Sequence, residues 1–470
     1  MTAVAKSEKA QIITQLRELF GERCALGQTI RDQHGKDVSF HPTCPPDAVV
    51  FAKSTQDVAA VVDICHASSV PVIPFGTGTS CEGGIGAISG GICIDLSQMN
   101  AILEVNTADF DCRVQAGVTR KQLNAELHGT GLHFPIDPGA DASLGGMAST
   151  RASGTNAVRY GTMRDNVMSL QVVMSSGEII ETGGRARKSA AGYDLTRLFT
   201  GAEGTLGIIT ELTLRLHPLP EGVSAARCGF PSLQTAIDTV IQVIQTGIPI
   251  GRIEFLDELQ VAACNRYSKL NLPEVPTLFF EFQGSPASLA EQVEMVEAIA
   301  RDNGGSGYAW ATTPEARSQL WQARHDVWWA ALALRPGCHG IPTDACVPIS
   351  MLGDAAVAAR QDVLELGLTA PMCGHVGDGN FHLCIVVNPD DADEMTRAAE
   401  LNARLMRRAI RLGGTCTGEH GIGYGKLDFL ELERGPSMHA MVAIKKALDP
   451  RNIMNPGKVL RVTDRYDTFQ

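Results

Sequence analysis

Short apolar runs alternate with amphipathic stretches through the first half of the chain. From residue 47 onward the pattern predicts a strand at 48–52, a helix at 54–69 and a second strand at 71–75, bounded by Gly, Pro and capping Ser residues. Further strands are predicted at 90–96, 111–118, 168–181 and 206–216. The segment 168–181 is interrupted by a Ser-Ser-Gly turn typical of a hairpin. This half is therefore expected to mix helices and strands.

The pattern restarts after the proline-rich run His217–Gly222, which we interpret as a domain boundary. The pattern of the residues after this run predicts helix 230–247, strand 251–257, strand 278–284, helix 288–305, one long helix 313–334, strands 343–349 and 380–388, and helix 393–414. This order indicates an α+β, ferredoxin-like unit. The predicted organisation is an N-terminal helical segment 1–42, a first domain 43–220, a second domain 221–460 and a tail 461–470.

Composition narrows the classes of function. The 470 residues carry 40 Lys+Arg against 52 Asp+Glu, a formal charge of −12, so no excess of cations favours nucleic acid. The 13 cysteines contain no C-x-x-C spacing and fit a reducing compartment. No run of eighteen apolar residues is present, and the N-terminus lacks the pattern of a secretory leader. We expect a soluble, cytoplasmic protein without a transmembrane segment.

Three clusters of small residues stand out in the first domain, at 74–86, 138–167 and 199–210. None has the spacing of a G-x-G-x-x-G dinucleotide loop or of a P-loop. Each by itself also fits an ordinary turn or surface loop. Backbone N–H groups without bulky side chains can converge on a diphosphate, however, and loops this long inside a domain are usually functional. Together the clusters imply an extended ligand with phosphates and a flat ring system.

The order PFGTGTSCEGG, PGADASLGG and GAEGTLGIITE resembles the FAD-binding domain of the vanillyl-alcohol oxidase and p-cresol methylhydroxylase (PCMH) superfamily, over about residues 40–220. The resemblance implies FAD, bound without a covalent link because the first loop has no His. It places the diphosphate on the first loop, with the expected cofactor contacts Pro74, Gly76, Thr77, Gly78, Thr79, Ser80, Gly84, Pro138, Gly139, Ser143, Gly145, Gly154, Thr155, Gly161, Glu203, Gly204 and Ile209.

The second domain contains histidines in glycine-rich surroundings: CGHVGDGNFH carries His375 and His382, and GTCTGEHGIG carries Glu419 and His420. A single histidine is more often a hydrogen-bonded structural residue than a ligand. Two imidazoles and one carboxylate, however, suit a divalent metal of the zinc, manganese or iron kind, and the spacing does not choose among them. The H-E-x-x-H helix of metalloproteases is absent.

These motifs, with the tail LDPRNIMNPGKVL, resemble the FAD-linked D-2-hydroxy-acid dehydrogenases: cytochrome-type D-lactate dehydrogenase, the D-subunit of glycolate oxidase and D-2-hydroxyglutarate dehydrogenase. The resemblance implies that His375, His382 and Glu419 hold the metal and that His420 is the catalytic base. It also implies that Asn455, in the C-terminal tail, lies beside the flavin. The metal would lower the pKa of the substrate hydroxyl while C2 gives a hydride to FAD.

Arg324 matches the family position that binds the substrate carboxylate, although a surface ion pair is an equal alternative, and Asn380 is expected to contact the substrate. Relatives that use dicarboxylates have a Lys before the Asp344 strand, and this chain has none at 339–343. D-Lactate is therefore favoured over D-2-hydroxyglutarate or glycolate.

A quinone, a cytochrome or an electron-transfer flavoprotein would accept the electrons. Peripheral membrane association, a homodimer, a non-catalytic FAD subunit and a metal-dependent hydrolase stay open.

Overall fold

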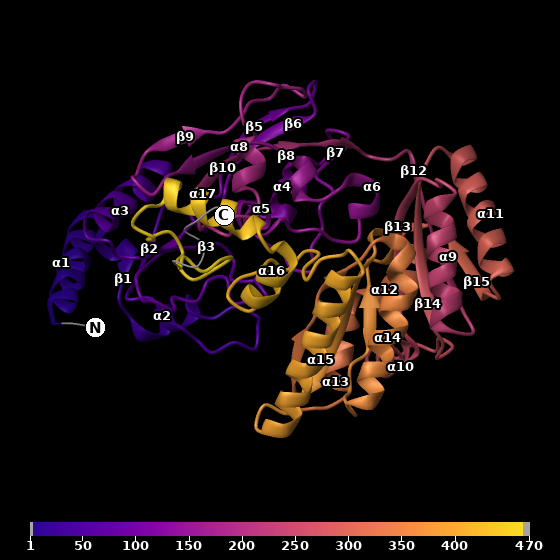
Figure 1. Cartoon of the computed structure of the whole chain (residues 1–470). Coiled ribbons are helices and arrows are strands. Elements are labelled where there is room, and N and C mark those ends of the chain that lie inside the picture. The colour runs from indigo at the N-terminus through magenta and orange to yellow at the C-terminus, as the bar shows by residue number, and fades with distance from the viewer. Residues whose placement is uncertain (1–2, 464–470) are drawn as a thin grey trace. The chain divides into compact units, whose positions relative to one another are not determined.

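The computed structural model describes residues 3–463, with side chains from residue 9 onward. It divides into two units (Figure 1): the first holds 3–153, 161–218 and 419–463, and the second holds 154–160 and 219–418. Residues from 419 onward group with the first unit, and the predicted domain bounds 43–220 and 221–460 stay predictions. Of the predicted tail 461–470, the part from 464 onward lies outside the described residues.

The first sheet of the first unit has four strands in the order β1 (Cys24–Ala25), β2 (Ala48–Phe51), β4 (Ile92–Asp95) and β3 (Val72–Phe75). The pairs β2–β4 and β4–β3 are parallel. Helices of this part are α1 (Ala3–Phe20), α2 (Gln28–Gln33) and α3 (Thr55–Ala67), with the short η1 (Gly21–Arg23). α3 is capped by Ser54, whose hydroxyl accepts the backbone N–H of Asp57. The strand–helix–strand pattern predicted for 48–75 is present.

The second sheet of this unit is antiparallel, in the order β5 (Ile102–Asn106), β6 (Asp111–Gln115), β10 (Ile208–Arg215), β8 (Val167–Val173) and β9 (Ile179–Glu181). The predicted hairpin joins β8 to β9. Short elements complete the unit: α4 (Arg120–Glu126), α5 (Leu144–Thr150), α7 (Met163–Asn166), α8 (Leu195–Phe199), and the paired strands β7 (Leu132–His133) and β11 (His217–Pro218). One apolar core runs through both sheets.

The C-terminal segment is built into the first unit. After α16 (Leu427–Arg434) and α17 (Ser437–Leu448), the chain lies beside β3, where the Val72 N–H donates to the Ile453 carbonyl at 2.8 Å. The buried Lys445 donates to the Asp449 carboxylate at 2.5 Å and to the Met454 carbonyl at 2.9 Å. A buried ion pair with further hydrogen bonds therefore fixes the return of the chain.

The second unit contains an antiparallel sheet of eight strands, β12 (Gly222–Gly229), β13 (Ile250–Leu256), β14 (Thr277–Gly284), β15 (Ser306–Ala311), β16 (His339–Pro342), β17 (Ala345–Cys346), β18 (Met372–Gly374) and β19 (Asn380–Val387). Its order is β15-β12-β14-β13-β18-β19-β16, with β17 beside β19. The first four strands with α9 (Leu233–Gln245) and α11 (Pro286–Asp302) form the ferredoxin-like arrangement that the sequence predicts.

The remaining helices of this unit are α6 (Ala157–Tyr160), α10 (Glu258–Ser268), α12 (Pro314–His325), α13 (Val327–Ala333), α14 (Leu352–Glu365) and α15 (Ala392–Arg411), with the short η2 (Ile349–Met351) and η3 (Val376–Asp378). The single helix predicted at 313–334 is wrong, because the chain breaks at Asp326 into α12 and α13. Asp326 accepts hydrogen bonds from Ser268 and Gln322. Competition of a short acidic side chain for polar partners favours a helix end there.

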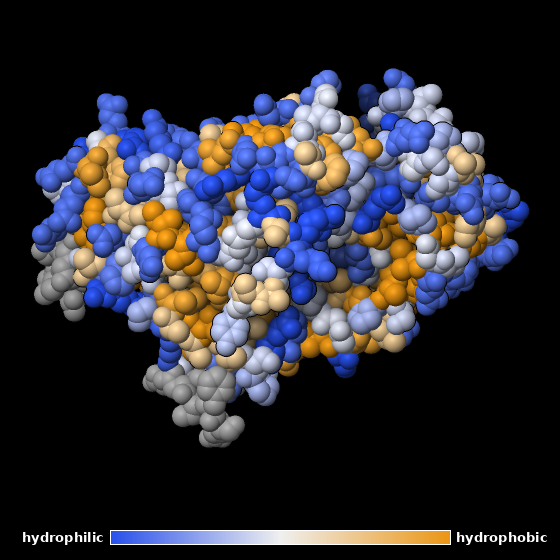
Figure 2. Space-filling model, turned by 90° about the horizontal axis from the view of Figure 1, so that it is seen from above, coloured by the Kyte–Doolittle hydropathy of each residue, from blue (hydrophilic) through white to orange (hydrophobic). Residues whose placement is uncertain are grey.

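Hydrophilic side chains cover much of the face seen in Figure 2, with hydrophobic residues gathered in patches between them. Within residues 3–463, none of the helices combines the length and the apolar character needed to cross a bilayer.

His217, in the β7–β11 pair, should make the free energy of unfolding depend on pH. His217 Nε2 lies 2.8 Å from Asn166 Oδ1, and burial, together with the charges of His133, Arg215 and Arg187, lowers the pKa of His217 to about 4. In the unfolded chain the pKa of a histidine is about 6.5. The unfolded state therefore holds more protons between about pH 4 and 6.5, and the free energy of unfolding should fall as the pH drops through that range.

We expect His217→Gln, which keeps a donor for Asn166, to make the acid side of the stability curve less steep. Denaturant unfolding at pH 4.5 and pH 7 measures the difference, with the exposed His128→Gln as the control. Equal pH dependence in wild type and His217→Gln would show that His217 does not titrate in this way.

Candidate active site

The first glycine loop follows β3 directly and lies against the second cluster. Pro74 is in the strand, and residues 76–78 form a bend after it. A Cβ added to Gly76 would lie only 2.3 Å from Ser143 Oγ, so the two loops approach more closely than any side chain at 76 permits. Ser143 precedes α5, whose Gly145 packs on Ala116. Two of the three predicted clusters therefore meet.

Asp37 holds the first loop in place. Its Oδ2 accepts the Ser80 hydroxyl at 2.6 Å and the Gly83 N–H at 2.9 Å. The third cluster reaches the same region, because a Cβ on Gly204 would lie 2.3 Å from the Pro74 ring. Asn455 completes the arrangement, since its Nδ2 donates to the Gly84 carbonyl at 3.0 Å and to the Glu203 carbonyl at 2.8 Å. The C-terminal segment thus joins the first and third loops.

These loops fit a phosphate-bearing cofactor. Ser143 Oγ is buried, and no residue that the structure describes offers it a hydrogen-bond partner. A buried hydroxyl normally has one, so a ligand oxygen would satisfy it. A Cβ added to Gly139, in the same cluster, would meet nothing within 4 Å, which leaves room beside the backbone there. FAD would be held by its phosphates at such loops, as predicted.

The other expected cofactor contacts are divided between the two units. Glu203 is buried, and its carboxylate accepts the N–H groups of Ile422 at 2.6 Å and Gly423 at 2.9 Å, so this side chain holds the C-terminal segment. Gly154 and Thr155 belong to the second unit. The remaining expected contacts lie in the first unit, namely Thr77, Gly78, Thr79, Pro138, Gly161 and Ile209. Their contacts with FAD stay predictions.

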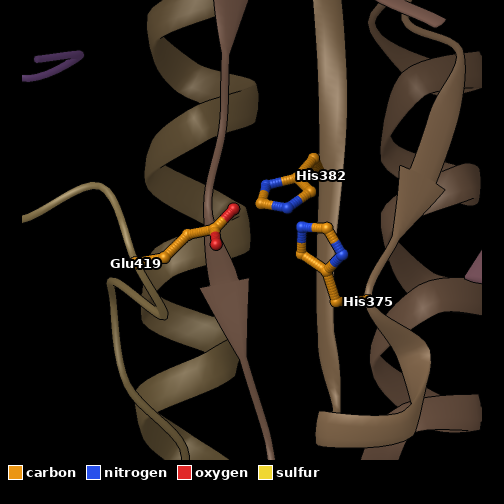
Figure 3. Close-up of side chains that lie close together, drawn as sticks. All are labelled: His375, His382 and Glu419. Atoms are coloured by element: carbon orange, nitrogen blue, oxygen red, sulfur yellow. The ribbon is translucent and has the colours of Figure 1, made fainter. Parts of the chain in front are cut away.

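The three predicted metal ligands come together. Figure 3 shows the rings of His375 and His382 beside each other with the Glu419 carboxylate facing them, and one ligand atom of each lies within 4.8 Å of the others. His375 follows β18, and His382 stands in β19 opposite Cys373 of β18. Glu419 follows directly on Gly418, where the second unit ends.

Both imidazoles are oriented by hydrogen bonds at Nδ1. His382 Nδ1 donates to the Thr343 carbonyl at 2.8 Å, and His375 Nδ1 donates to Glu254 at 2.8 and 3.0 Å. A proton held on Nδ1 puts the lone pair on Nε2, the tautomer that binds a metal. Two such histidines and one carboxylate are the donor set of zinc and related divalent ions. The residues therefore fit the predicted metal.

Glu254 is a site residue that the sequence analysis missed. It lies in β13 with less than 1% of its surface exposed, and it also accepts Arg324 Nε at 2.7 Å. Burial raises its pKa, but the charges and hydrogen bonds of His375 and Arg324 outweigh that and hold the pKa below its ordinary value. One signal was present: in the buried strand IGRIEFL, the polar residues 252 and 254 alternate and so share one face.

Arg324 and Asn380 were both expected at the substrate. The Nε of Arg324, near the end of α12, binds Glu254, and its role toward a substrate carboxylate stays a prediction. The Nδ2 of Asn380 donates to Asp344 Oδ1 at 2.7 Å and to the Ala345 carbonyl at 2.9 Å. Both amide hydrogens are therefore used within the protein, and Asn380 orients the buried Asp344.

His420, the expected base, lies in the first unit near a buried ion pair. Its Nδ1 is 3.9 Å from Glu82 Oε1, and that oxygen is 3.0 Å from Lys426 Nζ. Glycines at 421 and 423 have φ of +83° and +50°, a conformation that other residues rarely adopt. The turn that presents His420 therefore depends on glycine.

Comparisons with known proteins match most of the chain to two protein families. Residues 46–183 match a family described as an FAD binding domain, and residues 219–459 match the family of FAD linked oxidases, C-terminal domain. A probable mitochondrial D-lactate dehydrogenase of Danio rerio is 54% identical over 96% of this chain and 92% of its own length. A mitochondrial D-lactate dehydrogenase [cytochrome] of Arabidopsis thaliana is 44% identical over 97% and 82%.

More distant similarities show the same fold. The glycolate oxidase subunit GlcD of Bacillus subtilis is 35% identical over 88% of this chain and 89% of its own. Among solved structures, p-cresol methylhydroxylase with substrate bound superposes with a TM-score of 0.79 at 19% identity, over 98% of both chains. The predicted PCMH-type fold is confirmed. The Danio and Arabidopsis proteins are named mitochondrial, and the cytoplasmic location expected here stays a prediction.

Removal of one ligand should abolish tight metal binding. We expect His382→Ala to raise the dissociation constant for Zn²⁺ at least 100-fold, because two ligands hold a divalent ion far less tightly than three. The exposed His339→Ala, on the neighbouring strand β16, is the matched control and should bind Zn²⁺ as the wild type does. Titration against a competing chelator measures both. Unchanged affinity of His382→Ala would exclude the proposed ligand set.

Proposed function

The chain belongs to the family of FAD-linked oxidases, and from that premise we propose that it oxidises a short D-2-hydroxy acid, D-lactate first, to the 2-oxo acid. The observation that carries the proposal is the cluster of His375, His382 and Glu419, in which Nδ1 of each imidazole faces an oxygen acceptor and Nε2 is thereby left for a metal. The likeness to D-lactate dehydrogenases over nearly the whole chain supports the choice of substrate.

FAD would supply a hydride acceptor, and a divalent zinc, manganese or iron ion would supply a Lewis acid that acidifies the C2 hydroxyl. His375, His382 and Glu419 would hold that ion. Arg324 would bind the substrate carboxylate, a task suited to its planar guanidinium. His420 would take the hydroxyl proton onto a ring nitrogen as the C2 hydride leaves. The proton and the electron pair are thus both accounted for.

The proposed substrate has a single carboxylate. The segment His339–Pro342 forms strand β16 and, with Thr343, offers no lysine for a second one. A buried carboxylate without a cation would cost several kcal/mol, on the order of the penalty for an unpaired buried charge. D-2-Hydroxyglutarate should therefore be a poor substrate. Glycolate has one carboxylate too and is the alternative.

A cytochrome is the electron acceptor that we propose, since the Arabidopsis relative is named for one. A quinone or an electron-transfer flavoprotein would accept the same electrons. Comparison of turnover with each acceptor decides among them.

Anaerobic titration of the purified, FAD-loaded protein tests the function. We expect D-lactate, but not L-lactate, to bleach the visible flavin band, with bleaching lost after chelator treatment and restored by a divalent metal. Glycolate and D-2-hydroxyglutarate should act more slowly at equal concentration.

Other outcomes would point to other functions. A yellow protein that no hydroxy acid reduces would support a non-catalytic FAD subunit. A colourless protein with metal-dependent hydrolytic activity would contradict the proposal altogether.

The proposed base can be tested separately. His420→Asn should slow flavin reduction by D-lactate about 10²- to 10⁴-fold, the usual contribution of a general base. It should also remove the acid limb of the pH–rate profile, which reports protonation of that base. The flavin spectrum should persist, and the exposed His128→Asn should behave as wild type. Stopped-flow absorbance measures the rates. A full rate in His420→Asn would assign the base elsewhere.

A further inference from the structure

One buried carboxylate connects a metal ligand to the arginine of α12. Glu254 Oε1 and Oε2 lie 2.8 and 3.0 Å from His375 Nδ1, and Oε2 lies 2.7 Å from Arg324 Nε. Arg324 and His375 are far apart in the sequence, on α12 and after β18. All three residues belong to the second unit, so the contacts are internal to one body.

The sheet explains why these groups meet. β13 lies between β14 and β18, and β18 pairs with β19, so Glu254 in β13, His375 just after β18 and His382 in β19 come from three successive strands of the sheet. Leu256 is opposite Cys373, and Cys373 is opposite His382. Side chains of directly opposed residues share one face of a sheet, and residues two apart on a strand do as well. Glu254 therefore points to the same side as His382.

A structural ion pair alone does not require this arrangement. Glu254 is fully buried, and a buried pair is often no more stabilising than apolar residues of similar volume. A nearby pair on the same face shows the contrast: Arg252 and Glu281 of β14 lie 3.5 Å apart, and no histidine is bound to that carboxylate in the described structure. Glu254 contacts both a proposed ligand and the proposed carboxylate clamp.

We propose that Glu254 is a positioning residue that sets the metal site and the substrate-carboxylate site together. The inference rests on the proposed function. By accepting Nδ1–H, Glu254 keeps His375 Nε2 as the ligating atom. By accepting Nε–H, it fixes the plane of the Arg324 guanidinium and so the direction in which its terminal nitrogens face. Loss of this one carboxylate should therefore weaken two kinds of binding at once.

Glu254→Gln tests the proposal with nearly the same shape. Its amide has one acceptor oxygen and a donor NH₂, so one of the two donors, His375 or Arg324, would face another donor. We expect the dissociation constant of the FAD-loaded protein for Zn²⁺ to rise about 10- to 100-fold, the usual effect of losing such a partner. The KM for D-lactate at saturating Zn²⁺ should rise as well, with a smaller change in kcat.

Glu281→Gln is the control, because it makes the same change in a half-buried, ion-paired carboxylate on the neighbouring strand. It should leave Zn²⁺ affinity and KM unchanged, while thermal unfolding of both variants reports general destabilisation. Zn²⁺ affinity of Glu254→Gln within twofold of wild type, or an equal loss in Glu281→Gln, overturns the proposal. If Glu254→Gln does not fold, Glu254→Asp is measured instead. Its shortened carboxylate should still weaken Zn²⁺ binding. A Zn²⁺ affinity of Glu254→Asp equal to that of the wild type overturns the proposal.

The two proposals fail in different ways. Wild-type protein that binds Zn²⁺ but is not reduced by D-lactate contradicts the proposed function and leaves the zinc comparison of Glu254→Gln intact. Wild-type protein that D-lactate reduces, combined with unchanged zinc affinity in Glu254→Gln, contradicts the role of Glu254 alone.

Discussion

Buried charge has to be compensated, and the structure meets this requirement by joining segments that are distant in the sequence. Glu203 binds the backbone N–H groups of residues 422 and 423, and Lys445 binds Asp449 and the carbonyl of Thr205 in the third glycine cluster. Both contacts bring the C-terminal segment to the glycine loops. In the second unit, Glu254 does the same for α12 and β18. Removal of one partner from such a contact is costly because the other remains charged and buried.

The two candidate sites depend on different structural features. The loops around Gly76 and Ser143 depend on the absence of side chains, so that the backbone and one buried hydroxyl can face phosphate oxygens. The metal cluster depends on side chains whose hydrogen bonds fix their tautomers before any ion binds. Glu419 and His420 are consecutive residues, so the glycine-rich turn that carries them serves both the proposed ligand set and the proposed base.

Local patterns in the sequence predicted much of the fold, because strand alternation, the Ser54 cap and the glycine clusters depend on near neighbours along the chain. The close approach of His375, His382 and Glu419 was also predicted, since each lies in a glycine-rich motif that apolar packing does not explain. The helix break at Asp326 was missed because it depends on Ser268, a residue far away in sequence. Glu254 was missed for a similar reason: one acidic residue in an apolar strand reveals its role only when its partners from α12 and β18 are in place.

The proposed function depends on a divalent metal, held by His375, His382 and Glu419, that serves the oxidation of a D-2-hydroxy acid. A crystal structure of the FAD-loaded protein with Zn²⁺ and D-lactate, measured at the zinc absorption edge, tests this most directly. We expect one anomalous peak within bonding distance of both Nε2 atoms and of the Glu419 carboxylate, with the hydroxyl and carboxylate of D-lactate bound to the same ion. An anomalous map without a peak at these three residues would contradict it.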